Sequence, residues 1–119
     1  MKLQSLRPML WVNDVEKTIE YYTKVLRFTY SHFEPSEQWG YVIKDEVEIM
    51  FAKFEHLMPE GHPEFTGSLY LNTDNADAWW ELLKDRANVF YPIDNFSYNM
   101  REFAIKDCNG YILQFGQPI

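Results

Sequence analysis

Histidine is the residue type in this chain with the widest chemistry, and two of its three histidines lie close together. His56 and His62 are six residues apart, and three glutamates flank them, namely Glu55, Glu60 and Glu64. Imidazole and carboxylate groups bind divalent metals. Prolines interrupt this stretch, so no helix or strand would fix the geometry that a metal site needs. We therefore interpret it as a solvated linker.

His32 and Cys108 are the other side chains of this kind. A nucleophilic cysteine needs a nearby histidine and a lowered pKa, and no histidine is close to Cys108 in sequence. Cys108 belongs to the segment 107–110, whose Asn-Gly step is typical of a tight hairpin turn, so we interpret it as a turn residue. We expect His32 on the surface of a sheet. The sequence holds no phosphate-binding loop, Ser-x-Gly elbow or paired-carboxylate motif.

Aromatic residues are unusually frequent and make up 18% of the 119 residues. Together with a hydrophobic content of 46%, they exclude a disordered chain and indicate a dense core or a cavity lined by rings. The formal net charge of -7 repels phosphate backbones and anionic lipids. We therefore expect a small-molecule partner, and a cationic one in preference to nucleic acid or membrane.

Cysteine content and hydropathy bear on the cellular setting. A single cysteine excludes an internal disulfide and a multi-cysteine zinc site. The N-terminus shows no targeting signal, and every apolar run falls far short of the roughly 18 residues that span a bilayer. On these grounds we expect a cytoplasmic protein.

Two stretches of the chain show the same order of predicted elements. In each, a strand leads to an aspartate that suits a helix N-cap, and a helix and three strands follow. The two caps, Asp14 and Asp74, lie 60 residues apart, which indicates an internal duplication. Strands are predicted at 9–12, 28–33, 39–43, 47–53, 68–71, 89–92, 101–106 and 111–115, helices from 15 and around 79–83, and a loop at 94–99.

The predicted fold class is α+β, with two βαβββ modules in tandem. Module 1 spans about 5–54 and module 2 about 67–117, joined by a linker at about 55–66 within one domain over 1–119. A helix covers one face of each sheet, so the other face must curve around a ligand or meet its twin. We therefore predict a curved, cup-shaped mixed sheet. Free sheet edges favour its completion in a homodimer.

Three stretches, at 12–28, 71–77 and 101–115, resemble the vicinal oxygen chelate superfamily, which includes glyoxalase I, extradiol dioxygenases and bleomycin resistance proteins. The first contains Val12-Asn13-Asp14 and a Tyr-Tyr pair, and the last contains Asp-Cys-Asn-Gly where the family has Asp-Pro-Asp-Gly. Arg27 stands where the family usually has glycine. The resemblance covers nearly the whole chain and implies the two-module fold.

The superfamily's enzymes take metal ligands from the first and last strands of each copy. The resemblance places these positions at Arg7, Ser68 and Gln114, and at Met50 or, with a register shift of two, Glu48. Arginine is a permanent cation, and serine is a weak ligand. Only Gln114 and Glu48 are plausible donors, so we expect no metal site and no cofactor.

Aromatic side chains on the predicted strands either form the core or contact a ligand. Both interpretations stay open for Trp39, Phe51, Tyr91, Phe96, Tyr98 and Phe103. Bleomycin resistance proteins resemble this chain around Trp39, and Arg101 and Glu102 could supply charge at the rim of the cup. We predict no catalytic residue. The predicted ligand-binding residues are Trp39, Glu48, Met50, Arg101, Phe103 and Gln114.

Three functions follow from these observations. The resemblance to the bleomycin-resistance branch implies a metal-free homodimer that sequesters a cationic aromatic antibiotic without chemistry. The alternative is a metal-dependent lyase, isomerase or dioxygenase of the same fold that uses Gln114 and Glu48. A third possibility is the binding of an unrelated small metabolite. The missing ligands favour a binding protein over an enzyme, and the sequence does not separate the first possibility from the third.

Overall fold

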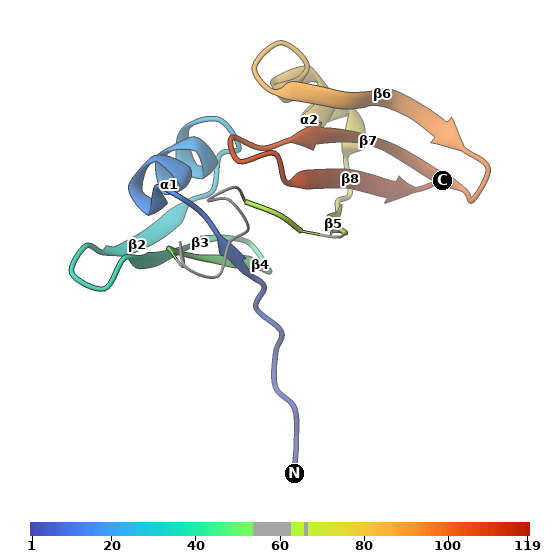
Figure 1. Cartoon of the computed structure of the whole chain (residues 1–119). Helices are drawn as coiled ribbons and strands as arrows, with labels where there is room; N and C mark the ends of the chain where they lie inside the picture. The colour runs from blue at the N-terminus through green and yellow to red at the C-terminus, as the bar shows by residue number, and fades with distance from the viewer. Residues whose placement is uncertain (54–62, 66) are drawn as a thin grey trace. The chain divides into compact units, whose positions relative to one another are not determined.

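The computed structural model describes residues 1–53, 63–65 and 67–119, which form two compact units, Met1–Pro63 and Glu64–Ile119 (Figure 1). We call them the N-terminal and C-terminal units. The predicted linker histidines, His56 and His62, lie outside the described residues. No helix in the described part of the chain is long and apolar enough to cross a membrane.

The two units have the same topology. In each described unit the first strand pairs in parallel with the last, and the other strands are antiparallel, in the orders β1-β4-β3-β2 and β5-β8-β7-β6. This confirms the prediction of an α+β fold with two tandem βαβββ modules. The elements are β1 (Met9–Trp11), α1 (Val15–Lys24), β2 (Tyr30–Glu34), β3 (Trp39–Lys44), β4 (Val47–Ala52), β5 (Ser68–Asn72), α2 (Ala76–Leu83), β6 (Asn88–Phe96), β7 (Met100–Lys106) and β8 (Ile112–Pro118).

Helix α1 begins and packs as its sequence predicts. The Asp14 carboxylate accepts a hydrogen bond from the Lys17 backbone N–H at 3.0 Å and satisfies one of the free amides of the first turn. The apolar positions are buried, and the Tyr22 ring lies 4.8 Å from the Phe51 ring on β4. Beyond the helix, Arg27 adopts a φ of +65°, which explains why glycine suits this position.

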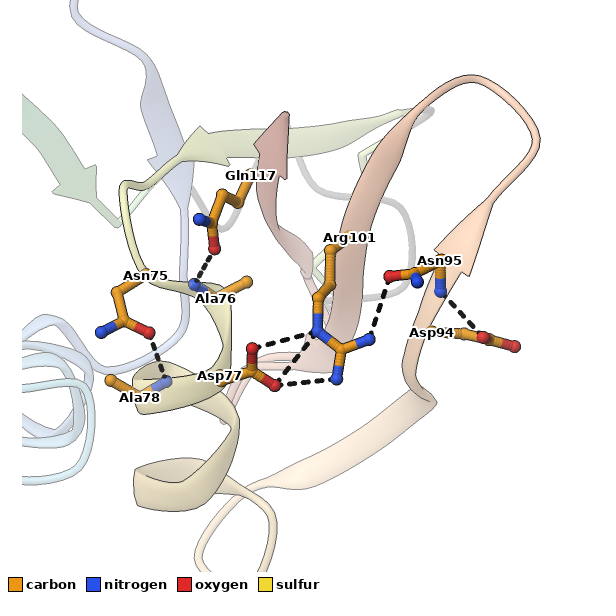
Figure 2. Close-up of polar contacts among 8 residues, drawn as sticks. All are labelled: Asn75, Ala76, Asp77, Ala78, Asp94, Asn95, Arg101 and Gln117. Carbon is orange, nitrogen blue, oxygen red and sulfur yellow. Dashed lines mark hydrogen bonds and ion pairs between the residues drawn. The ribbon is translucent and has the colours of Figure 1, made fainter. Parts of the chain in front are cut away.

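The cap of helix α2 differs from the prediction by one residue. Asn75, and not Asp74, is the N-cap, and its side-chain oxygen accepts from the Ala78 backbone N–H at 3.0 Å (Figure 2). Asparagine and aspartate cap helices about equally well, so residue type alone did not distinguish them. The helix packs through Trp79 on Phe115, with the ring centroids 5.1 Å apart.

The segment after α2 is one long strand and not the predicted short strand and loop. β6 runs from Asn88 to Phe96 and contains Pro92, with register shifts against β7 on either side of Tyr91. Proline cannot donate a ladder hydrogen bond, and it is tolerated here because β6 is an edge strand with irregular pairing. Pro92 therefore lies within a bulged edge strand and does not end it.

The segment between β7 and β8 is the tight turn that its sequence predicts. Gly110 has a φ of +87°, which glycine adopts without strain. The buried Asp107 carboxylate accepts from the backbone N–H groups of Asn109 and Tyr111, both at 2.8 Å. Cys108 is exposed in this turn.

Each sheet has one face that packs against its helix, and we call the opposite face the helix-free face. On β3 a Cβ atom at Gly40 would lie 2.6 Å from Ile19 of α1, so Gly40 marks the helix side of this sheet. On β7 the helix side is marked by Phe103, whose ring lies 5.3 Å from Trp80 of α2. Neighbouring residues along each strand point to the helix-free face.

Candidate functional site

Four rings line the helix-free face of the N-terminal unit. Tyr30 and His32 come from β2, Trp39 and Tyr41 come from β3, and we call the four the aromatic ladder. The Trp39 and Tyr41 rings are parallel to within 16° with centroids 6.1 Å apart, and the His32 ring lies 5.6 Å and 5.5 Å from them. Alternate residues of paired strands share a face, so the sheet itself brings these rings together.

The ladder is fixed by polar contacts and is partly exposed. The Trp39 indole N–H donates to the Glu37 carboxylate at 3.0 Å, and the Tyr30 side chain is 52% exposed. A hydrogen bond with Tyr30, together with burial, raises the pKa of Tyr41. The position of His32 on the sheet surface agrees with the sequence prediction. The exposed ring surface offers a stacking platform for a flat molecule.

An ion pair lies beside this ladder. The Arg7 guanidinium is 2.7 Å from the Glu48 carboxylate, 3.7 Å from the Met50 sulfur and 5.6 Å from the centre of the Tyr41 ring. The side chain of Arg7 is 43% exposed and that of Glu48 is 27% exposed. Met50 pairs with Tyr41 across β3 and β4. Three predicted residues, Trp39, Glu48 and Met50, therefore share one face with Arg7.

The helix-free face of the C-terminal unit has a different chemistry, built around a buried carboxylate. Glu102 on β7 is fully buried, and one of its oxygens accepts from the Tyr70 hydroxyl at 2.8 Å. Its other oxygen accepts from the Tyr91 hydroxyl and, at 3.5 Å, from the Gln114 amide. Tyr98 is a further donor whose influence lowers the pKa of this carboxylate. We call these five residues the tyrosine–carboxylate cluster.

The cluster holds Glu102 in its charged form. Burial alone would raise the pKa of Glu102, but the hydrogen bonds from Tyr91, Tyr98 and Tyr70 outweigh it and leave the pKa below its ordinary value. The phenols respond in the opposite direction. Burial and the nearby carboxylate raise the pKa of Tyr91 to about 12 and also raise the pKa of Tyr70. At neutral pH the cluster is thus one anion surrounded by neutral donors.

Gln114 connects this cluster to the first strand of the unit. The Ser68 hydroxyl on β5 donates to the Gln114 side-chain oxygen at 2.5 Å, and the Gln114 amide donates to the Tyr91 hydroxyl at 2.9 Å. The first-strand and last-strand positions implied by the resemblance are therefore in contact in each unit, as Arg7 with Glu48 and as Ser68 with Gln114.

These four residues do not fit a divalent metal. The Glu48 carboxylate is already neutralised by Arg7, a permanent cation that would repel a metal ion at the same oxygens. Ser68 and Gln114 are neutral groups bonded to each other. Among the described residues no group of three or more His, Cys, Asp and Glu side chains could hold a metal ion.

Arg101 and Phe103 lie on the helix side of the C-terminal sheet. Arg101 makes paired hydrogen bonds of 2.8 to 3.1 Å to the Asp77 carboxylate on α2, which lower the pKa of Asp77 (Figure 2). Phe103 is fully buried and stacks on Phe115, with centroids 5.0 Å apart. Alternation along β7 puts these two residues on the helix side and Glu102 on the other. Their contacts give both a structural role.

Three features of the helix-free faces were missed by the sequence analysis. Glu102 was expected as a rim charge, which is wrong because it is fully buried. Tyr41 and Tyr70 were not singled out, although each is central to its face. Period-two alternation places Tyr41 with Trp39 and separates Glu102 from Phe103, so part of this pattern was available from the sequence.

Comparisons with known proteins give the following. The family model of the Glyoxalase/Bleomycin resistance protein/Dioxygenase superfamily matches residues 4–115. No curated protein sequence matches the chain. Solved structures of the same fold include a glyoxalase-related enzyme from Clostridium phytofermentans, with a TM-score of 0.79, 17% identity, and coverage of 100% of this chain and 98% of that one.

Two further structures differ in what they bind or catalyse. One is the bleomycin-binding protein of Streptomyces verticillus complexed with copper(II)-bleomycin, with a TM-score of 0.73, 19% identity, and coverage of 97% of this chain and 96% of that one. The other is lactoylglutathione lyase of Agrobacterium tumefaciens, with a TM-score of 0.71, 12% identity, and coverage of 96% and 92%. At these identities the likeness concerns the fold.

Proposed function

Because the chain belongs to the glyoxalase/bleomycin resistance protein/dioxygenase superfamily, we propose that it is a small-molecule-binding protein that captures a flat, cationic ligand without chemistry. The proposed site is the aromatic ladder of the N-terminal unit with its neighbours Glu48 and Met50. Gln114, the predicted ligand-binding residue of the C-terminal unit, lies in the tyrosine–carboxylate cluster of that unit. Such a protein needs only affinity for its ligand.

The observation that carries this proposal is the 2.7 Å contact between Arg7 and Glu48. The superfamily's metal enzymes would need a free donor at this place, and here the carboxylate is bound to a guanidinium. Binding does not depend on that donor. The rings beside it offer stacking worth roughly 0.5–1.5 kcal/mol each beyond area burial, and the net charge of -7 attracts a cation.

We propose a homodimer in a cytoplasmic setting as the working state. In the described sheets β2 and β6 are edge strands, whose unpaired backbone groups favour association. Sedimentation equilibrium tests this assembly, and a monomer at micromolar concentration would contradict it. The single cysteine agrees with a reducing compartment.

The proposal is tested by titration with proflavine, a flat aromatic cation, and with bleomycin, using the fluorescence anisotropy of proflavine directly and in competition. Removing the ring in Trp39→Ala is expected to weaken binding about two- to tenfold, which corresponds to the stacking contribution of one ring. Phe65→Ala is the matched control, because Phe65 is 50% exposed in the C-terminal unit and is not part of the ladder. Unchanged affinity in Trp39→Ala, or no binding by either probe, would overturn the proposed site.

The second candidate function is a metal-dependent lyase, isomerase or dioxygenase. It is favoured by one observation, which is that Glu48 and Gln114 retain oxygen-donor side chains at the last-strand positions. Metal content of protein purified without chelator decides between the two functions. One equivalent of a first-row metal per chain, lost in Glu48→Gln, would support the enzyme, and trace amounts would support the binding protein.

A further inference from the structure

We propose that the tyrosine–carboxylate cluster of the C-terminal unit is a subsite for an organic ammonium group, which sits against the ring faces of Tyr70 and Tyr98. This inference rests on the proposed small-molecule-binding function. It adds the chemical group that the helix-free face of the C-terminal unit recognises, namely a weakly hydrated cation such as a trimethylammonium.

The charge of the buried Glu102 carboxylate is not compensated by a cation in the described part of the chain. The described hydrogen-bond partners of Glu102 are neutral, because they are the hydroxyls of Tyr70 and Tyr91 and the amide of Gln114. No ion pair within the described chain includes Glu102, whereas Glu48 has Arg7. A buried anion that is hydrogen-bonded but has no countercharge makes the surrounding potential negative.

Tyr70 and Tyr98 extend the negative potential of Glu102 to the protein surface. Glu102 itself is fully buried, but the Tyr70 and Tyr98 side chains are 39% and 56% exposed. A phenol that donates its proton toward a carboxylate gains electron density in its ring, and the faces of aromatic rings already attract cations. The Tyr70 hydroxyl is engaged with Glu102, so its ring face is the surface that remains for a ligand, and the exposed Tyr98 ring is a second such surface.

The rings of Tyr70 and Tyr98 are held in place before any ligand binds. Tyr98 stacks on Phe96 at 5.6 Å and 15°, and Phe96 in turn meets Tyr91 edge-on at 5.5 Å. Tyr70 lies directly over Gly116, where a Cβ atom would overlap its hydroxyl. A preorganised set of rings loses less conformational entropy on binding.

An ammonium–ring contact already exists within this unit. The Lys106 ammonium lies 5.1 Å above the centre of the Phe90 ring. Lys106 follows Glu102 by four residues on β7 and therefore points to the same face. The chain itself thus places an alkylammonium on an aromatic ring of this sheet.

The same geometry selects an organic cation over a metal ion. Hard divalent ions need several oxygen ligands at about 2.0–2.6 Å, and the Glu102 oxygens are enclosed by their hydrogen-bond donors. A trimethylammonium needs no oxygen ligand and is attracted to ring faces. This is why the ligand class is an organic ammonium.

The experiment compares choline with 3,3-dimethylbutan-1-ol, its uncharged isostere, by amide NMR titration of the full chain. We expect choline to bind at least fivefold more tightly than the isostere, with shifts at residues of β5, β7 and the turn at 97–99. Equal binding of the two probes, or no binding of choline up to 50 mM, would overturn the proposal.

Three variants locate the binding. Tyr98→Leu removes an exposed ring and is expected to weaken choline binding about three- to tenfold, while Phe65→Leu, which removes a ring of similar exposure outside the cluster, leaves it unchanged. Glu102→Gln removes the charge and is expected to reduce the preference for choline over the isostere. If Tyr98→Leu binds choline as well as the parent, or if Phe65→Leu loses as much, the cluster is not the subsite.

The outcomes also separate this proposal from the proposed function. Choline binding is expected to survive Trp39→Ala, because Trp39 belongs to the other unit. Loss of choline binding with proflavine binding intact would overturn the ammonium subsite and leave the ladder. Binding of choline without any binding of proflavine would overturn the ladder and leave the subsite.

Discussion

Each helix-free face contains a glutamate, and the two units share one topology, but the charge of the glutamate is stabilised differently in each. In the N-terminal unit Glu48 is partly exposed and lies 2.7 Å from Arg7. In the C-terminal unit Glu102 is fully buried and accepts hydrogen bonds from tyrosine hydroxyls and an amide. One carboxylate is compensated by a cation, and the other is stabilised by neutral donors. Two units with the same strand order therefore differ in both the strand and the environment of this carboxylate, which is on β4 in one unit and on β7 in the other.

This difference has an energetic consequence. A partly exposed ion pair is screened by water and salt, so it contributes little to stability. A buried carboxylate depends on every donor that replaces its hydration, because each lost hydrogen bond leaves a desolvated charge. The N-terminal face should therefore tolerate substitution of its carboxylate, and the C-terminal face should not.

The largest expected loss of stability comes from substituting a glycine, and it should be larger in the N-terminal unit than in the C-terminal unit. At Gly40 a Cβ atom would lie 2.5 Å from the His32 backbone oxygen and 2.6 Å from Ile19, and backbone cannot move aside cheaply. Gly40→Ala should lower the free energy of unfolding by about 3 kcal/mol. At Gly116 the obstacle is the Tyr70 side chain, which can move aside only by giving up its hydrogen bond to Glu102, so Gly116→Ala should cost about 2 kcal/mol. Urea unfolding measures both, and a reversed order would contradict this interpretation of the two sheets.

The next effect tests the carboxylates directly. Glu102→Gln places an amide donor among hydroxyls that already donate, and we expect a loss of about 2 kcal/mol in the free energy of unfolding. Glu48→Gln, the matched change in the other unit, should cost less than about 1 kcal/mol. Urea unfolding at pH 7 with both variants provides the measurement. Equal losses would show that burial does not distinguish the two sites.

Alkaline pH should destabilise the C-terminal cluster. Burial and the Glu102 carboxylate raise the pKa of Tyr91 to about 12, while a tyrosine of the unfolded chain titrates near its ordinary value of about 10. Between these values the unfolded state loses a proton that the folded state keeps, so stability falls as pH rises from about 10 to 12. Because Tyr91 is partly exposed, we expect about 1 kcal/mol from this residue.

Urea unfolding as a function of pH, with phenolate absorbance as the second readout, checks this effect. Tyr91→Phe should flatten the decline between pH 10 and 12. Tyr30→Phe is the comparison in the N-terminal unit, where Tyr30 raises the pKa of Tyr41, and it should leave the contribution of Tyr91 unchanged. A decline of equal steepness in Tyr91→Phe and the parent would exclude Tyr91 as its source.

The smallest expected effect concerns Arg7. Arg7→Gln should change the free energy of unfolding by less than about 0.5 kcal/mol, because the pair with Glu48 is partly exposed to solvent. The remaining difference should vanish in 1 M NaCl, where screening acts within about 3 Å. A loss above 1 kcal/mol that persists in high salt would mean that the ion pair is structural, and the contrast between the two faces would then be weaker.

Much of the fold was predictable because its determinants are local. The apolar spacing from Val15 and the cap at Asp14 predict α1, and the Asn-Gly step predicts the turn before β8. The extent of β6 was not predictable in this way. Pro92 normally ends a strand, and only the pairing with β7 shows that it lies on an edge.

The candidate site was predictable only in part, for a related reason. Alternation along a strand assigns Trp39 and Tyr41 to one face, and Phe103 and Glu102 to opposite faces. Which face is covered by a helix depends on how the helix docks, and this is not encoded in the strand. Arg101 was therefore expected at a ligand site, whereas its guanidinium is bound to Asp77 on α2.

By itself, the sequence determined the two-module α+β fold, the duplicated order of elements and the charge of the protein. These properties follow from local patterns of residue type. Only the tertiary structure decided that Arg7 neutralises Glu48 and that Glu102 is enclosed by Tyr70 and Tyr91. Such contacts join residues 11 to 41 positions apart, and their energies depend on burial, which strand pairing and helix docking create.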